Sequence, residues 1–168
     1  MSNRHLVLGA ALGAGAKPLL RRLLLAKLRH DVARLNAGDR SALLRAYADD
    51  FVLHFADGDH RWAGDWVGRQ GMDRFLQNFT AAGIQGEIEE LTTSGPPWAL
   101  VLWVRFDDHA DGPDGTRLYE NSTVLMLRTR WGKVVEQWDF YRDTERITHF
   151  DRRLAELGVE PAHRPTAA

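Results

Sequence analysis

The sequence predicts a single α+β domain, and two observations support this fold class. Segments with helical spacing of apolar residues come first, and four strand-like segments then follow in a run. The connections between these strands are short, which favours antiparallel pairing, because parallel strands need a crossover of a dozen or more residues. The 168 residues are enough for one domain with a substantial apolar core.

The first element is a basic arm, residues 1–17, which we expect to be mobile and separate from the domain. Its apolar run from Leu6 to Ala16 is far shorter than the roughly 20 residues that span a bilayer. Arg4 before this run and Ala14-Gly15-Ala16 at its end are typical of a secretory signal. A cytoplasmic location is nevertheless the preferred interpretation, with export as the alternative, because glycines make the run weakly hydrophobic.

A helix is predicted from Pro18, a residue that favours the first helical position, to a stop at Asn36-Ala37-Gly38. Its apolar residues follow at spacings of four, four, four and three: Leu20, Leu24, Leu28, Val32 and Leu35. Basic residues lie mostly off this stripe, so residues 18–35 could rest on a membrane surface. A core helix with a solvated face is the preferred alternative.

A second, short helix should begin after Asp39, a good N-cap, and place Leu43, Leu44 and Tyr47 inward. Residues 51–56 then have the pattern of a strand. A third helix carries apolar residues on one face and stops at Gly83; they are Met72, Phe75, Leu76, Phe79 and Ala82.

Four strands are predicted at about residues 84–93, 98–107, 116–129 and 133–142, with the polar segment 108–115 as one of the separating turns. A final helix runs from Thr144 to Gly158, so the domain spans residues 18–158. Residues 159–168 are expected to be a flexible tail. Strand 98–107 is apolar on both faces, so we expect helices on one side and a second subunit on the other, as in a homodimer.

Composition excludes several kinds of site. The chain has no cysteine, which excludes thiol nucleophiles, thiolate zinc sites and iron–sulfur clusters. The net charge of −1 gives no reason to expect nucleic acid as a partner. No nucleotide-binding motif is present, and His54, His60, Asp57 and Asp59 are better explained as a polar turn than as metal ligands. We therefore expect no cofactor and no metal.

Three stretches in order along the chain point to a family: N-A-G-D-R-S-A-L-L-R-A-Y-A-D-D-F-V-L-H-F (36–55), A-G-D-W-V-G-R-Q-G-M-D-R-F (63–75) and G-K-V-V-E-Q-W-D-F-Y-R-D (132–143). They resemble the SnoaL-like branch of the nuclear transport factor 2 superfamily, which includes ketosteroid isomerases, polyketide cyclases and limonene epoxide hydrolase. The resemblance implies a cone-shaped curved antiparallel sheet wrapped around N-terminal helices, with a C-terminal helix, an apolar pocket and often a dimer through the outer sheet face. The same fold also serves non-catalytic modules.

The positions that match the ketosteroid isomerase residues depart from that pattern. Asp31 lies near the position of the tyrosine, and Thr123 or Val124 near that of the acidic oxyanion donor. The base position falls at His54 or Phe55. Steroid isomerisation by that mechanism is therefore disfavoured.

Three residues are candidates for catalysis. His54 could be a general base, since Leu53 and Phe55 would occupy the opposite face of its strand; a hydrogen-bonded core histidine is the alternative. Alternation along the last strand places Gln137, Asp139, Tyr141 and Asp143 on one face. Of these, Asp139 matches the late acidic residue of the cyclases, and an apolar surrounding would raise its pKa. A structural ion pair of Asp139 with Arg105 or Arg142 is the alternative. Arg105 is the third candidate. Together with Asp139, Tyr119 and Asn121 on adjacent predicted strands, it resembles by residue type the epoxide hydrolase set, an Asp–Arg–Asp device with Tyr and Asn orienting water.

Candidate substrate-binding residues are Trp62, Trp66, Phe75, Tyr119, Asn121 and Tyr141. The first two belong to the loop that borders the cone mouth in relatives, whereas Trp103 and Trp138 are better explained by core or dimer packing. We therefore expect a protein that binds a small, mostly apolar molecule, with cofactor-free proton transfer of isomerase, cyclase or epoxide hydrolase type. A non-catalytic ligand-binding or dimerisation module is the alternative, and the sequence leaves open whether the chain is an enzyme.

Overall fold

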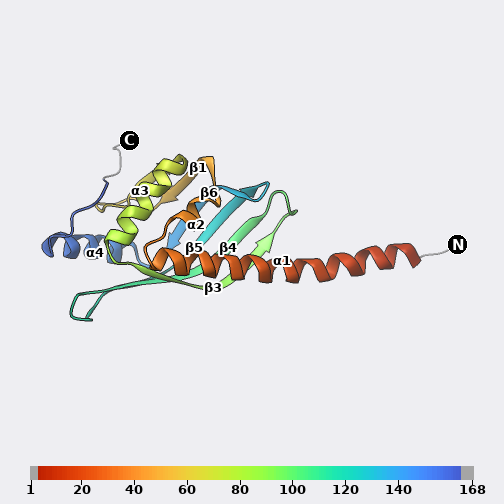
Figure 1. Ribbon diagram of the computed structural model, residues 1–168, viewed down its shortest axis with the longest axis horizontal. Coiled ribbons are helices and arrows are strands. Elements are labelled where there is room, and N and C mark those ends of the chain that lie inside the picture. The colour runs from red at the N-terminus through yellow and green to blue at the C-terminus, as the bar shows by residue number, and fades with distance from the viewer. Residues whose placement is uncertain (1–3, 164–168) are drawn as a thin grey trace.

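The computed structural model describes residues 4–163, with side chains from Pro18 onward. A curved six-stranded sheet wraps around helices and stays open, which confirms the α+β class and the cone (Figure 1). The helices are α1 (Arg4–Asn36), α2 (Ser41–Leu44), α3 (Gly68–Ala81) and α4 (Thr144–Glu156). The strands are β1 (Tyr47–Phe55), β2 (Gly64–Val67), β3 (Gln85–Ser94), β4 (Val101–Asp111), β5 (Arg117–Arg130) and β6 (Lys133–Tyr141).

The strands lie side by side in the order β2-β1-β6-β5-β4-β3. The antiparallel pairing predicted for the four consecutive strands is confirmed for β3 to β6. β1 and β6 are parallel, so the sheet as a whole is mixed. This parallel pair is feasible because the whole segment from β2 to β5 serves as its crossover connection.

Three strands differ from those that the sequence pattern predicts. β1 begins at Tyr47, so this residue belongs to the sheet and not to the short helix before it. The short strand β2 is not predicted, because Gly64 and Asp65 are turn-forming residues; pairing with β1 holds it in place. β4 continues to Asp111, beyond the predicted end at residue 107. This last difference determines where the acidic residues of β4 point.

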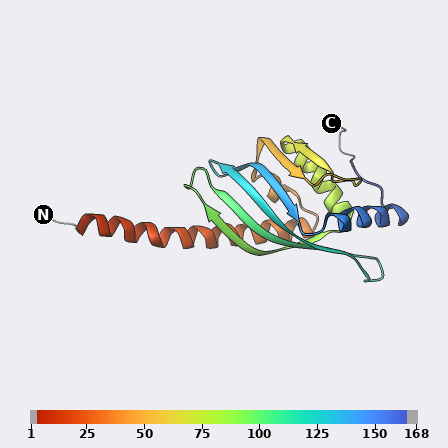
Figure 2. The ribbon, with the colours of Figure 1, turned by 180° about the vertical axis from the view of Figure 1, so that it is seen from behind.

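Helix α1 begins at Arg4 and passes through Pro18, where the sequence predicts its start. Residues 1–3 lie outside the described part of the chain. The N-terminal half of α1 extends beyond the sheet in both views (Figures 1 and 2). No helix among residues 4–163 combines the length and apolar character needed to cross a bilayer.

The core fills the concave side of the sheet. From α1, the predicted stripe packs inward: Val32 and Leu35 are buried, and Leu20, Leu24 and Leu28 are partly buried against the core. The predicted apolar faces of α3 and α4 are also buried, among them Phe75, Phe79 and Phe150. Contact of the exposed basic residues of α1 with a membrane surface stays a prediction.

The chain after α4 returns to α3. Asn78 is fully buried, and its side-chain amide donates to the carbonyl oxygens of Arg61 and His163 and accepts from the His163 backbone N–H. Arg61 is also buried, pairs with Asp151 and donates to the Val159 carbonyl at 2.8 Å. Residues 159–163, part of the expected flexible tail, are therefore anchored to the domain, whereas residues 164–168 lie outside the described part.

Candidate functional site

A cavity of about 80 Å³ lies between α1, α3 and the inner face of the sheet. Its lining is mainly apolar and includes Leu28, Met72, Phe75, Val104 and Leu125. Its polar lining comes from one end of β1 and from β6: Tyr47, Gln137, Asp139 and Tyr141. The cavity therefore surrounds one carboxyl group with hydrocarbon and a few hydrogen-bonding groups.

Strand alternation places Asp139 in this cavity. Successive side chains of a strand point to opposite faces, so Gln137, Asp139 and Tyr141 share the inner face of β6, as the sequence predicts. The Gln137 side chain donates to Asp139 Oδ1 at 2.7 Å and accepts from the Tyr47 hydroxyl at 3.0 Å. Burial raises the pKa of Asp139 to about 7. Near neutral pH this carboxyl group can therefore both take up and release a proton.

A second buried carboxyl group belongs to Asp108 on β4, which is 2% exposed. The Tyr141 hydroxyl donates to Asp108 Oδ2 at 3.0 Å, and Tyr119 makes a longer contact with the same oxygen at 3.4 Å. Asp108 Oδ1 has no hydrogen-bond partner in the described part of the chain. Burial raises the pKa of Asp108 to about 7, although the tyrosine hydrogen bonds act in the opposite direction.

The two carboxyl groups belong to one interior. A smaller cavity of about 10 Å³ lies beside Asp108, between Trp62, Tyr119 and Phe150. Phe75, Phe79 and Tyr141 line both this cavity and the larger one. The charge of Asp108 also contributes to the raised pKa of Asp139. Burial raises the pKa of Tyr119 and Tyr141, so both phenols stay protonated and act as hydrogen-bond donors.

Five of the nine candidate site residues line these two cavities: Asp139, Phe75, Tyr141, Tyr119 and Trp62. Trp66 is buried nearby and donates to the Trp62 carbonyl, but it lines neither cavity. Asp139 has no ion pair with Arg105 or Arg142 among the described residues; its partner is Gln137.

His54 and Arg105 lie on the outer face of the sheet, away from Asp139. Leu53 and Phe55 occupy the face opposite to His54, as predicted, but that face is the core. His54 stacks on Trp138, contacts Asp65 at 2.9 Å and lies 3.6 Å from Glu136. Arg105 pairs with Glu89 at 3.3 Å. The inner cavity therefore contains neither side chain.

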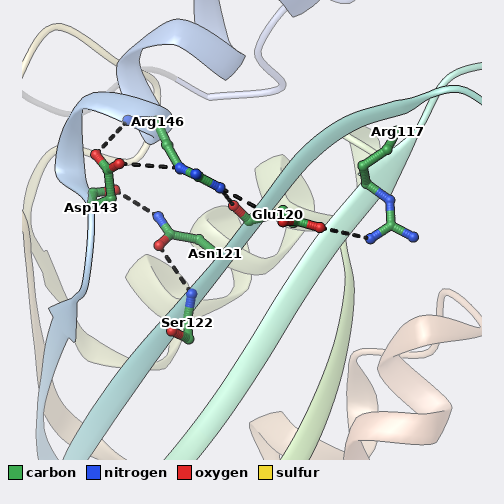
Figure 3. Close-up of polar contacts among 6 residues, drawn as sticks. All are labelled: Arg117, Glu120, Asn121, Ser122, Asp143 and Arg146. Carbon is green, nitrogen blue, oxygen red and sulfur yellow. Dashed lines mark hydrogen bonds and ion pairs between the residues drawn. The ribbon is translucent and has the colours of Figure 1, made fainter.

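Asn121 borders a polar groove of about 300 Å³ at the end of the sheet. Its amide donates to the Asp143 carbonyl at 2.6 Å, and Glu120 lies between Arg117 and Arg146 (Figure 3). Arg146 also pairs with Asp143 at 3.1 Å. These groups largely satisfy one another. Within the described residues no cluster of histidine and acidic side chains could hold a metal ion.

Asp108 is absent from the predicted site, because the polar composition of residues 108–115 predicts a turn, whereas β4 continues to Asp111. The signal was present: Leu102, Val104 and Phe106 alternate on one face, and one more step of two residues reaches Asp108. Strand β4 follows this alternation as far as Ala110, which is also buried. The ketosteroid-related position Asp31 is buried on α1 and pairs with Lys27.

Comparison with known proteins agrees with this architecture. The SnoaL-like domain family matches residues 28–137, more than half of the chain. Among solved structures, PrhC from Penicillium brasilianum has a TM-score of 0.62 and 17% identity, and the alignment covers 83% of this chain and 92% of PrhC. TerC, crystallised with polyporic acid, has a TM-score of 0.58 and 17% identity, with coverage of 76% and 96%.

A third solved structure, Bal32a from a soil-derived mobile gene cassette, has a TM-score of 0.58 and 18% identity. The alignment covers 76% of this chain and 92% of Bal32a. No curated protein sequence matches the chain. These structural likenesses concern the fold. The family match begins within α1 and ends at residue 137 within β6, so it includes Asp108 on β4 and stops two residues before Asp139. The chain therefore belongs to the SnoaL-like domain family.

Proposed function

We propose that this protein binds a small, mostly apolar molecule in the inner cavity and transfers a proton there without a cofactor. The observation that carries the proposal is the position of Asp139, a carboxyl group with a pKa of about 7 in a largely apolar cavity. A general base works best when its pKa lies near the working pH. Asp139 meets this condition because burial disfavours its charged form.

Asp108 and Tyr141 supply the complementary groups. Tyr141 lines the cavity beside Asp139, and its hydroxyl is bonded to Asp108. An ionised Asp108 disfavours ionisation of Asp139, which adds to the effect of burial on the pKa of Asp139. In the proposed step Asp139 removes a proton from a carbon next to a carbonyl group. For this step the protonated Asp108 carboxyl donates its hydrogen bond to the Tyr141 oxygen, so the Tyr141 O–H is free to turn to the substrate and donate to the enolate oxygen that forms.

This arrangement favours isomerase or cyclase chemistry over epoxide hydration. The epoxide hydrolase reading requires Arg105 and Asn121 beside Asp139, but Arg105 is on the outer face and Asn121 borders the polar groove. Of the residues that resemble the epoxide hydrolase set, Tyr119 is the remaining one, and it lines the smaller cavity. Isomerisation moves a proton between two positions of one substrate, so it does not need an arginine and an asparagine beside the carboxylate.

Cavity size limits the ligand. A volume of about 80 Å³ is below the roughly 300–1,000 Å³ of typical small-molecule sites. A small cyclic ketone fits the proposal only with some movement of lining side chains. Met72 is suited to such movement, because methionine adapts to irregular spaces. The crystallisation of the structural relative TerC with polyporic acid supports ligand binding in this fold.

The test is hydrogen–deuterium exchange at the carbon next to the carbonyl of small ketones and lactones, followed by proton NMR in heavy water. We expect the wild type to accelerate exchange and Asp139→Asn to lose about 10²-fold or more of that acceleration. Glu90→Gln is the control, because this exposed carboxyl group on β3 lines neither cavity, and it should behave as wild type. Equal exchange rates for wild type and Asp139→Asn would refute the assignment.

A non-catalytic ligand-binding module is the second candidate, and the small size of the cavity favours it. Saturation-transfer NMR with the same ketones distinguishes the two. Binding without accelerated exchange in folded wild type supports the module, whereas binding with exchange supports the enzyme.

A further inference from the structure

The N-terminal part of α1 differs from the rest of the chain in charge. Residues 1–30 contain six basic side chains and no acidic one. Of the 22 basic residues in the chain, 16 therefore lie after residue 30, together with all 23 acidic residues, and this remainder has a net charge of −7. A cationic segment on an otherwise anionic protein favours contact with an anionic partner.

The cationic segment is helical and only partly covered. Helix α1 is continuous from Arg4 to Asn36, and its N-terminal half extends beyond the sheet in both views (Figures 1 and 2). Its described apolar contacts with the core begin at Leu20. Leu19 and Leu23, each one residue before an inward-facing leucine, are 58% and 61% exposed. Helix α1 therefore has a second apolar face that the described residues leave uncovered.

Helical spacing extends this face along α1. Leu19, Leu23 and Ala26 follow one another at intervals of four and three residues, and Ala26 is also exposed. In the sequence, Leu12 lies seven residues before Leu19, and Leu8 lies four residues before Leu12. Such intervals place residues on one side of an α-helix. We call these five positions the outward stripe; they extend over about 27 Å of the helix axis.

Basic residues flank the outward stripe. Each residue advances about 100° around a helix, so Arg22 and Lys27 lie on opposite sides of the stripe. Arg21 and Arg22 are exposed and have no ion-pair partner among residues 18–163, whereas Lys27 pairs with Asp31. An arginine side chain can lay its apolar stem along such a stripe and keep its guanidinium group in the polar layer. An apolar helix face bordered by cations is typical of a helix that lies in a membrane interface.

We infer that α1 docks the protein on the surface of a bilayer that contains anionic lipids. The helix lies parallel to the surface, with the outward stripe at the boundary between headgroups and acyl chains and with Arg21 and Arg22 beside the lipid phosphates. Anionic lipids repel the net negative charge of the remaining chain, so contact is confined to α1. The inference goes beyond the proposed function and does not depend on it, since it uses neither the inner cavity nor its chemistry.

Other partners fit the outward stripe less well. Pairing with α1 of a second copy would bring the same uncompensated arginines together, which like-charge repulsion disfavours. Nucleic acid would compensate the arginines but would leave the exposed leucines in water. A bilayer surface satisfies both kinds of side chain, because its headgroups carry negative charge and the layer beneath them is apolar.

The first test is co-sedimentation of the full chain with phosphatidylcholine vesicles, with and without phosphatidylglycerol. We expect binding to the anionic vesicles that weakens at high salt, because salt screens surface charge. Arg21→Glu combined with Arg22→Glu should lower the partition coefficient by about 30-fold. Arg152→Glu combined with Arg153→Glu is the matched control, because it makes the same charge change at two adjacent exposed arginines of α4; it should bind as wild type. A wild type that stays in solution, or an α1 variant that binds as tightly as wild type, would overturn the inference.

The second test examines whether the outward stripe enters the membrane. Because the chain has no cysteine, Leu19→Cys creates a single position for a polarity-sensitive dye. With anionic vesicles the fluorescence of this dye should increase and shift to shorter wavelength. Leu157→Cys is the control, since Leu157 is 46% exposed at the end of α4, and its dye should not respond. An unchanged spectrum at position 19 in vesicle-bound protein would overturn docking through this face.

The same material tests the competing partners, and circular dichroism shows whether each variant is folded. Tighter binding of the wild type to a random-sequence DNA duplex than to the anionic vesicles would overturn the inference in favour of nucleic acid. Self-association without vesicles that Leu23→Ser abolishes would overturn it in favour of a second copy of α1.

Discussion

The Asp108 carboxyl group should make the protein less stable as the pH rises from 4 to 7. Its pKa is raised from 3.8 to about 7 in the folded state, because burial disfavours the charged form. Between these values the folded protein holds a proton that the unfolded chain has already released. Since the folded state binds more protons, the free energy of unfolding falls as pH increases.

The magnitude follows from the two pKa values. Each tenfold change in an ionisation constant corresponds to about 1.4 kcal/mol, so the carboxyl group of Asp108 costs about 4 kcal/mol of stability at pH 8 compared with pH 3. Asp108→Asn keeps an acceptor for the Tyr141 hydroxyl but cannot ionise. This variant should therefore become more stable than the wild type, by up to about this amount, as the pH passes from 4 to 8.

The assay is urea unfolding of wild type, Asp108→Asn and the control Glu90→Gln, an exposed carboxyl group on β3, at several pH values. The informative quantity is the difference between variant and wild type, because other titrating groups then cancel. Coupling to Asp139 would spread the change over a wider pH range. A difference between Asp108→Asn and wild type that stays constant from pH 4 to 8 would refute the buried, proton-holding carboxyl group.

Three further predictions concern other buried groups. His60 is buried without partners for its ring nitrogens in the described part of the chain, and burial lowers its pKa, so the free energy of unfolding should fall as the pH drops below about 6.5. His60→Leu should remove this loss in urea unfolding; a free energy of unfolding that depends on acid pH as in wild type would contradict it. A Cβ on Gly86 would lie 2.0 Å from the Phe106 ring, so Gly86→Ala should lower the free energy of unfolding by about 1–3 kcal/mol; a melting temperature equal to wild type would count against the close contact. Asn78→Ala should cost about 1–3 kcal/mol and expose the C-terminal segment to proteolysis, which limited digestion and mass spectrometry would detect; intact resistance would show that Asn78 does not anchor it.

Local patterns predict the features that depend on residues close in the sequence. The apolar stripe of α1 and the alternation that places Gln137, Asp139 and Tyr141 on one face are both present in the structure. In each case the periodicity of the element itself decides which side chains share a face. The order of helices and strands likewise follows from the spacing of apolar residues and turns.

The sequence by itself therefore determined the α+β order, the faces of α1 and β6, and the presence of Asp139 beside Tyr141. Only the tertiary structure decided that His54 points outward, that β1 pairs in parallel with β6, and that β4 continues far enough to bury Asp108. The physical reason is that the alternation of side chains along a strand defines two faces but does not determine which of them the helices cover. Strand length and pairing depend on partners that are distant in sequence, because the hydrogen bonds that extend β4 come from β3 and β5.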